Sequence, residues 1–307
     1  MFKLQIKYLS FFFGIVSILS FFNILYSYYF NLYLNLDTYY FTLLASFILF
    51  ITFFKFGKYD IKSNIFQKIL TIFLGYLLIP LVLSIPFYFS IYNLTFSNSF
   101  FEAISGFTST GFTVFDNIKL IDQSLVIWRS STQWLGGLYF LFSIIYLIDI
   151  YDDSFKKTLT NYISFNSSEI LKQAAKIFIL YSSLTIMIFI ILNIFSIRTF
   201  DSLNLALTII SSGGFLPVNE LSIIIKENAQ IIIFSLLMLF SFFSLFFSYN
   251  LIFLRKKNIN FFYEDLHLLI YLVVVVTIFF LFFSFNFDFF INLFAIVSSM
   301  TNIGFSL

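Results

Sequence analysis

Seven apolar runs, each close to the length needed to cross a bilayer, divide this sequence. They lie near residues 8–30, 38–56, 69–91, 125–148, 174–197, 229–254 and 266–285. A spanning α-helix needs about 20 apolar residues, because the hydrocarbon core of a bilayer is about 30 Å thick. Lipid offers no hydrogen-bond partner, so each run must satisfy its own backbone by forming a helix. The sequence therefore predicts an all-α polytopic membrane protein with about seven transmembrane helices.

Composition excludes several classes of protein. The 307 residues are 60% hydrophobic and 10% charged, whereas soluble domains carry about 25% charged residues. A net charge of +2 is too small to suggest a nucleic-acid partner. The absence of cysteine excludes disulfides, thiol catalysis and sulfur-ligated metal. Acid pairs with histidine, metal-ligand clusters and activated nucleophiles are missing too, which argues against an enzyme. We expect no covalently bound cofactor.

Three short segments with a shared pattern follow the third, fifth and seventh runs. They read FFEAISGFTSTGFT (100–113), TIISSGGF (208–215) and SSMTNIGF (298–305). Each is too short to cross a bilayer and too apolar for an ordinary solvent loop. They align on three glycines that each precede a phenylalanine, with small polar residues three and six positions earlier. The glycines are Gly111, Gly214 and Gly304; the polar residues are Thr108, Ser211 and Thr301, and Ser105, Thr208 and Ser298.

Cation binding gives a physical reason for such segments. Glycine adopts backbone angles that other residues avoid, so successive carbonyl groups can turn toward one axis. Rings of carbonyl oxygens replace the hydration shell of an ion, and the C-terminal end of a short preceding helix adds negative potential. Irregular backbone at membrane depth is tolerated where protein or a wet cavity surrounds it. We therefore expect three re-entrant pore loops that contribute to one ion path.

The order of the runs predicts repeats of helix, pore loop and helix. Residues 1–60 form an N-terminal helix hairpin without a pore loop. The first repeat covers 61–150 and the second 151–258. The third covers 259–307 and stops directly after its pore loop, so we expect it to be incomplete and a fourth repeat to be absent.

Basic residues indicate the orientation of the chain. With the N-terminus in the cytoplasm, 13 of the 17 Lys and Arg residues fall in inner segments and 4 in outer segments. Short cytoplasmic loops carry such an excess of basic residues. The orientation places all three pore loops at the outer face, where an ion would enter.

With these residues laid out, the chain resembles the membrane subunits of the Trk/Ktr/HKT potassium transporter superfamily, the TrkH type most closely. The resemblance is most specific in FFEAISGFTSTGFT, in WRSSTQWLGG (128–137) and in AIVSSMTNIGFSL (295–307). It implies potassium uptake across the bacterial inner membrane through a selectivity filter made of backbone carbonyls, with potassium as the substrate. By position, the filter residues are Ser109, Thr110 and Gly111; Ser212, Gly213 and Gly214; and Asn302, Ile303 and Gly304.

The resemblance also implies partners. Members of the family are homodimers and bind a cytosolic nucleotide-binding subunit of the TrkA type; the remaining contacts are with membrane lipid. The family has four repeats around one axis, so a further chain supplying the missing repeat is a possible partner here. The alternative function is a non-conducting truncated remnant, or a split subunit that needs another membrane chain to complete its pore.

Several other residues carry weaker expectations. Glu102 is expected at the start of the first pore helix and paired with Arg129, while Asp201 and Asp288 lie near the starts of the other two pore helices. Acids at helix N-termini favour the helix dipole, and together they could also concentrate cations at the pore mouth. Pro80 and Pro86 predict a kink in the third run. The pair Gly136-Gly137 predicts close helix packing, with a gating hinge as the alternative.

Overall fold

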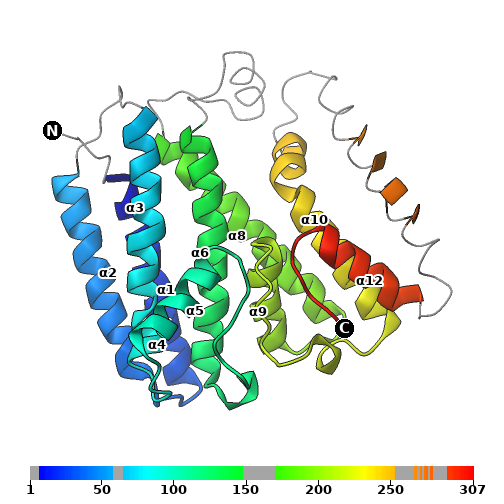
Figure 1. Cartoon of the computed structure of the whole chain (residues 1–307), viewed down its shortest axis with the longest axis horizontal. Coiled ribbons are helices and arrows are strands. Elements are labelled where there is room, and N and C mark those ends of the chain that lie inside the picture. Colours follow the sequence, from blue (N-terminus) through cyan, green and yellow to red (C-terminus); the bar gives the residue numbers. More distant parts are fainter. Residues whose placement is uncertain are drawn as a thin grey trace.

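The structure is a computed structural model that describes residues 7–57, 65–147, 170–252, 289–307 and several residues between 266 and 278. Everything described in it is helix, turn or irregular backbone. The chain runs from a helix pair at one side, α1 (Lys7–Tyr29) and α2 (Leu36–Phe56), to α12 (Phe289–Met300) at the other (Figure 1). The seventh predicted run, 266–285, lies mostly outside the described residues.

The long helices match the other six predicted runs closely. After α1 and α2 come α3 (Ile65–Leu83), α6 (Gln123–Leu147), α8 (Ile170–Ile194) and α10 (Asn228–Ile252). In the described part of the chain, four helical stretches are long and apolar enough to span a membrane: Lys7–Tyr29, Leu36–Phe56, Phe66–Tyr88 and Ile177–Ile194. Helix α6 is less apolar because the polar stretch RSSTQ (129–133) lies in its middle, and these five residues are buried.

The helix of the third run is interrupted between its two prolines. Helix α3 continues through Pro80 and ends at Leu83, and the short α4 (Ile85–Tyr88) begins after Ser84 with Pro86 in its first turn. Proline lacks a backbone donor, so it is tolerated at the start of a helix and weakens the interior of one.

Three short helices lie between the long ones. They are α5 (Phe96–Phe107), α9 (Thr199–Ile210) and α12, and all three lie in the lower half of the view in Figure 1. Helix α5 packs on α3, α4 and α6; α9 packs on α8, α6 and α10; and α12 packs on α10. Each short helix therefore packs against the long helices that flank it in sequence, as far as those are described.

The helix pair α1–α2 covers one side of this assembly. Helix α1 packs on α3 and α6, whereas α2 lies outside it and exposes a row of large apolar side chains. Phe47, Ile48 and Phe54 are about half exposed on α2. Apolar faces of this extent are stable where lipid, rather than water, surrounds them.

Candidate functional site: three glycine turns

Each short helix ends in a turn of the same backbone geometry; we call residues 108–112, 211–215 and 301–305 the first, second and third glycine turn. The glycines Gly111, Gly214 and Gly304 have φ of 82°, 82° and 77°. Two residues earlier the backbone is also left-handed, with φ of 54°, 52° and 59° at Ser109, Ser212 and Asn302. Only glycine adopts such angles without strain, and Asn and small polar residues tolerate them better than most.

The same backbone hydrogen bonds close all three turns. The amide before each glycine donates to the carbonyl five residues earlier: Thr110 to Ser105 at 2.9 Å, Gly213 to Thr208 at 2.9 Å, and Ile303 to Ser298 at 3.2 Å. In each turn, a residue with negative φ thus lies between two left-handed residues. The sequence pattern thus corresponds to one local structure made three times.

The hydroxyl residues three positions before the glycines terminate the short helices. Thr108, Ser211 and Thr301 each follow the last helical residue, and each donates its hydroxyl to the carbonyl four residues earlier, at 2.7, 3.0 and 2.9 Å. The backbone amides of Thr108 and Thr301 donate to the same carbonyl groups, so each of these two carbonyls accepts two hydrogen bonds at the end of its helix. These three residues therefore contact the ends of the short helices, and their supporting role in the filter stays a prediction.

The three turns meet one another, as their shared pattern led us to expect. A Cβ placed on Gly111 would lie 2.7 Å from the carbonyl oxygen of Gly213 and 3.4 Å from Cα of Gly214. A Cβ placed on Gly214 would lie 2.8 Å from the carbonyl oxygen of Ile303. Gly111 and Gly214 thus each face the following turn in sequence order, which brings together residues of all three predicted filter segments. Beside Gly304, no described atom lies within 4 Å of such a Cβ.

Helix α6 positions the first two turns by packing against both short helices. On one side a Cβ on Gly136 would lie 1.9 Å from the carbonyl oxygen of Phe107 at the end of α5. On the other side a Cβ on Gly137 would lie 2.9 Å from Cβ of Ser211 at the end of α9. The glycine pair is therefore a close-packing device, and the gating hinge is not needed to explain it.

A buried ion pair lies behind the first turn. Nε of Arg129 donates to Oε1 of Glu102 at 2.8 Å, and the two side chains are 1% and 0% exposed. The carboxylate also accepts the amide of Val114 at 2.9 Å and the hydroxyl of Thr113 at 3.0 Å. The attraction within a buried ion pair offsets the cost of desolvation only when the remaining hydrogen bonds are satisfied, and here both partners have several.

The guanidinium of Arg129 extends this network to the second turn. It lies over the ring of Phe215, with its central carbon 4.3 Å from the ring centre, and it reaches the carbonyl of Leu216 at 3.5 Å. A cation over an aromatic face is attracted by the ring quadrupole. One side chain of α6 therefore contacts the exit of both turns, and the predicted Glu102–Arg129 pair is confirmed with this wider role.

The predicted place of Glu102 at the start of a helix is wrong. Helix α5 begins at Phe96, because Thr95 caps it by accepting the amide of Asn98, so Glu102 lies mid-helix and faces Arg129. Its charge is therefore neutralised locally and does not contribute to a pore mouth. Asp201 does lie in the first turn of α9; Asp288 lies outside the described residues.

Gln133 was missed by sequence reasoning. It is fully buried on α6, one helical turn beyond Arg129, and its amide bonds to the backbone of the second turn on both sides of Gly214. The one available signal was the doubled glycine of SSGGF, since Gly213 has negative φ and needs a different reason to lack a side chain.

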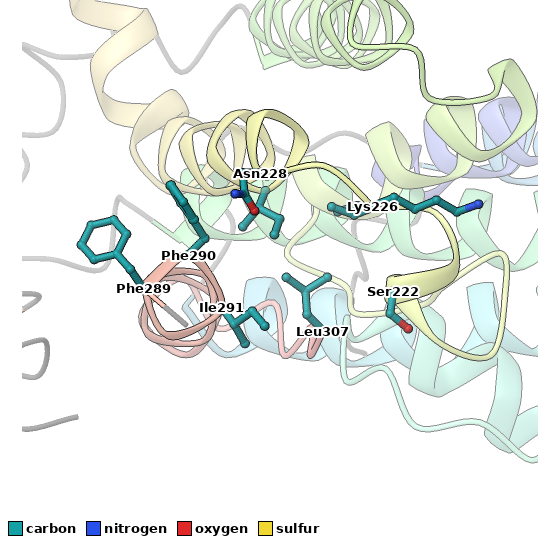
Figure 2. A pocket seen from close by; sticks show the side chains of 9 residues that line it. Ser222, Lys226, Asn228, Phe289, Phe290, Ile291 and Leu307 are labelled. Atoms are coloured by element: carbon teal, nitrogen blue, oxygen red, sulfur yellow. The ribbon is translucent and has the colours of Figure 1, made fainter. Parts of the chain in front are cut away.

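A cavity of about 550 Å³ lies apart from the three turns. It is between the start of α12 and the loop before α10, and Phe290, Asn228 and Leu307 converge on it (Figure 2). The side chain of Lys226 extends away from the other labelled residues. Most of the residues that line the cavity are apolar, and its lysine points away from the others. The described cavity therefore has no charged side chain directed at a ligand.

Three features define the class of protein to which this chain belongs. They are apolar helices of membrane-spanning length, short helices between them, and glycine turns that converge. This is an integral membrane protein of helix–pore-loop–helix architecture.

Comparison with known proteins refines that class. No family model matches the chain. It is 26% identical over 243 residues to an uncharacterised cation transporter of Methanocaldococcus jannaschii, covering 76% of this chain and 48% of that protein. It is 25% identical over 178 residues to the Trk system potassium uptake protein TrkH of Halomonas elongata, covering 55% of this chain and 36% of that protein.

A solved structure shares the fold over the whole chain. The crystal structure of the potassium transporter TrkH from Vibrio parahaemolyticus superposes with a TM-score of 0.74 at 18% identity, covering 100% of this chain and 66% of that one. In sequence and in fold, the chain is thus similar to proteins named as TrkH potassium uptake proteins. It spans about half or less of the length of these curated relatives.

Proposed function

We propose that the chain forms part of the potassium-conducting pore of a Trk-type uptake system. Potassium ions are coordinated by backbone carbonyls of residues 109–111, 212–214 and 302–304, and α5, α9 and α12 act as the pore helices. The observation that carries this proposal is the convergence of three turns of equal backbone geometry, Gly111 against Gly213 and Gly214 against Ile303. Potassium uptake proteins among the relatives supply the identity of the ion.

The repeat organisation belongs to the same proposal. Residues 1–60 are a peripheral hairpin, 61–150 and 151–258 are two repeats, and 259–307 is part of a third. The excess of basic residues in one set of loops supports an N-terminus in the cytoplasm. A bacterial inner membrane location, a homodimeric assembly and a cytosolic TrkA-like regulatory partner are extended to this chain from the resemblance.

A second candidate function rests on the open side of the third turn. Gly111 and Gly214 each face a following turn, whereas Gly304 faces no described atom within 4 Å. A further segment of similar chemistry, from the rest of a longer protein or from another chain, would close the ring there. In this alternative, the 307 residues alone do not conduct. Each backbone group that lipid leaves unsatisfied costs on the order of several kcal/mol.

Uptake in cells lacking their own potassium uptake systems tests both candidates. We expect the 307-residue chain alone to give no rubidium uptake, and co-expression with a segment carrying one and a half further repeats to restore it.

In that assembly, Gly111→Ser should reduce the preference for potassium over sodium, since its φ of 82° and the carbonyl 2.7 Å away leave no room for a side chain. Unchanged selectivity would contradict the carbonyl filter, and uptake by the purified chain alone in liposomes would contradict the alternative.

A further inference from the structure

The three glycine turns differ in how the phenylalanine after each glycine is held by hydrogen bonds. In the first turn the Ser105 hydroxyl donates to the carbonyl of Phe112 at 2.6 Å, and in the third the Ser298 hydroxyl donates to the carbonyl of Phe305 at 2.7 Å. Thr208 occupies the equivalent position before the second turn. Its hydroxyl is fully buried, and among the described residues it has no hydrogen-bond partner.

Gln133 supplies the second turn with hydrogen bonds from outside the turn. Its Nε2 donates to the carbonyl of Gly213 at 2.5 Å, and its Oε1 accepts the amide of Phe215 at 3.2 Å. The two bonds lie on either side of Gly214, so one planar amide fixes the turn at two points. Both partners are backbone groups in a buried place, where an unmade hydrogen bond is costly.

Gly213 makes this approach possible. A Cβ at that position would lie 2.4 Å from Cδ and from Oε1 of Gln133. Since Gly213 has negative φ, contact with Gln133, rather than backbone conformation, accounts for the glycine. The equivalent residues of the other turns, Thr110 and Ile303, both have side chains.

In the part of the chain that the structure describes, the third turn receives no similar contact from its neighbouring helix. There α10 presents Phe234, whose ring lies 5.7 Å from the ring of Phe305. The contact with Gln133 therefore distinguishes the second turn, and it couples that turn to α6 of the first repeat.

We propose that Gln133 is a positioning residue for ion selectivity: it sets the direction of the Gly213 carbonyl and thereby makes the second turn depend on α6. This inference rests on the proposed function of the turns as an ion path. A carbonyl oxygen has two lone pairs, so the Gly213 oxygen can accept from Gln133 and still face an ion.

Gln133→Met tests the proposal because it keeps the volume and removes both hydrogen bonds. Gln230→Met is the matched control. Gln230 is also buried; it donates to the carbonyl of Phe195 and accepts the amides of Lys226 and Glu227, but its partners lie outside the glycine turns. Two quantities are measured on the purified chain in detergent: hydrogen exchange of peptides covering 213–216, and the melting temperature in potassium, sodium or choline chloride at equal ionic strength.

We expect Gln133→Met to speed exchange of the Phe215 amide about tenfold with or without potassium. It should also raise the potassium concentration for half-maximal stabilisation about tenfold and shrink the difference between potassium and sodium. Gln230→Met should lower the melting temperature in all three salts and leave the ion difference unchanged. An unchanged Phe215 exchange rate, or equal ion responses in both variants, would overturn the role of Gln133.

Gly213→Ala gives the same information if Gln133→Met does not fold. Alanine tolerates the backbone angles there and displaces Gln133 from its partners, so the exchange and ion responses should match those expected for Gln133→Met. Wild-type protein without any potassium-specific stabilisation would contradict the proposed function, while the exchange of Phe215 would still decide whether Gln133 fixes the turn.

Discussion

At the scale of single residues, buried polar side chains near the turns form hydrogen bonds with backbone groups of the turns and of the residues that follow them. Glu102, Arg129 and Gln133 lie on two helices, and their polar atoms contact one another or residues in and directly after the turns. Side chains of this kind fix carbonyl groups in place, which is the condition for replacing a hydration shell by protein.

Glu102→Gln should destabilise the protein strongly. The substitution leaves Arg129 buried without a counter-charge, and breaking a buried pair from one side costs about 3 kcal/mol or more. A marked fall in melting temperature in detergent is the expected result. Glu220→Gln is the control, because Glu220 is exposed and should tolerate the change. Equal melting temperatures for the two variants would argue against the network behind the first turn.

Removing the hydroxyl six residues before each glycine should change the free energy of unfolding by different amounts in the three turns. Ser105→Ala and Ser298→Ala each remove a hydrogen bond to a backbone carbonyl and should cost about 1 kcal/mol. Thr208→Val removes a hydroxyl without a described partner and keeps the shape of the side chain, so it should be neutral or stabilising. Thermal unfolding of the three variants measures this, and an equal loss in all three would contradict the asymmetry.

At the scale of elements, the sequence predicted the helices and the turns well. Apolar run length located six described helices, five of them to within four residues at both ends, because lipid allows few other structures. The third run was predicted to end at residue 91, but α3 ends at Leu83 and the short α4 follows it. The shared glycine pattern likewise identified the ends of α5, α9 and α12. The contacts between elements were harder to predict. The start of α5 depended on the Thr95 cap, and the place of Gln133 depended on how α6 packs between two short helices.

Gly136→Ala tests how tightly α6 packs on α5. The added methyl would stand 1.9 Å from the backbone carbonyl of Phe107, which cannot move without displacing the end of α5. We expect a loss of stability of about 1–3 kcal/mol or more, as for overpacked cores. Gly14→Ala is the matched control, since its methyl would meet only the Phe50 ring at 3.3 Å. If both alanines were tolerated equally, close packing would not explain the glycine pair.

At the scale of the whole molecule, orientation is the first property to test. Cysteines introduced at Lys119 and Glu220, exposed in the loops after the first and second turns, should react with a membrane-impermeant maleimide from outside. A cysteine at Ser154 should react only after the membrane is opened. The chain has no native cysteine, so the background is clean. Reversed labelling would overturn the proposed topology.

The central claim is that three turns from one chain converge on a single path for potassium. The measurement that tests it most directly is anomalous diffraction from crystals grown with thallium(I), a heavy monovalent stand-in for potassium. Our account predicts anomalous peaks among the carbonyl oxygens of residues 109–111, 212–214 and 302–304, displaced by excess potassium and weakened in Gly111→Ser. Well-ordered turns with no peak between them, or peaks that sodium displaces equally well, would contradict it.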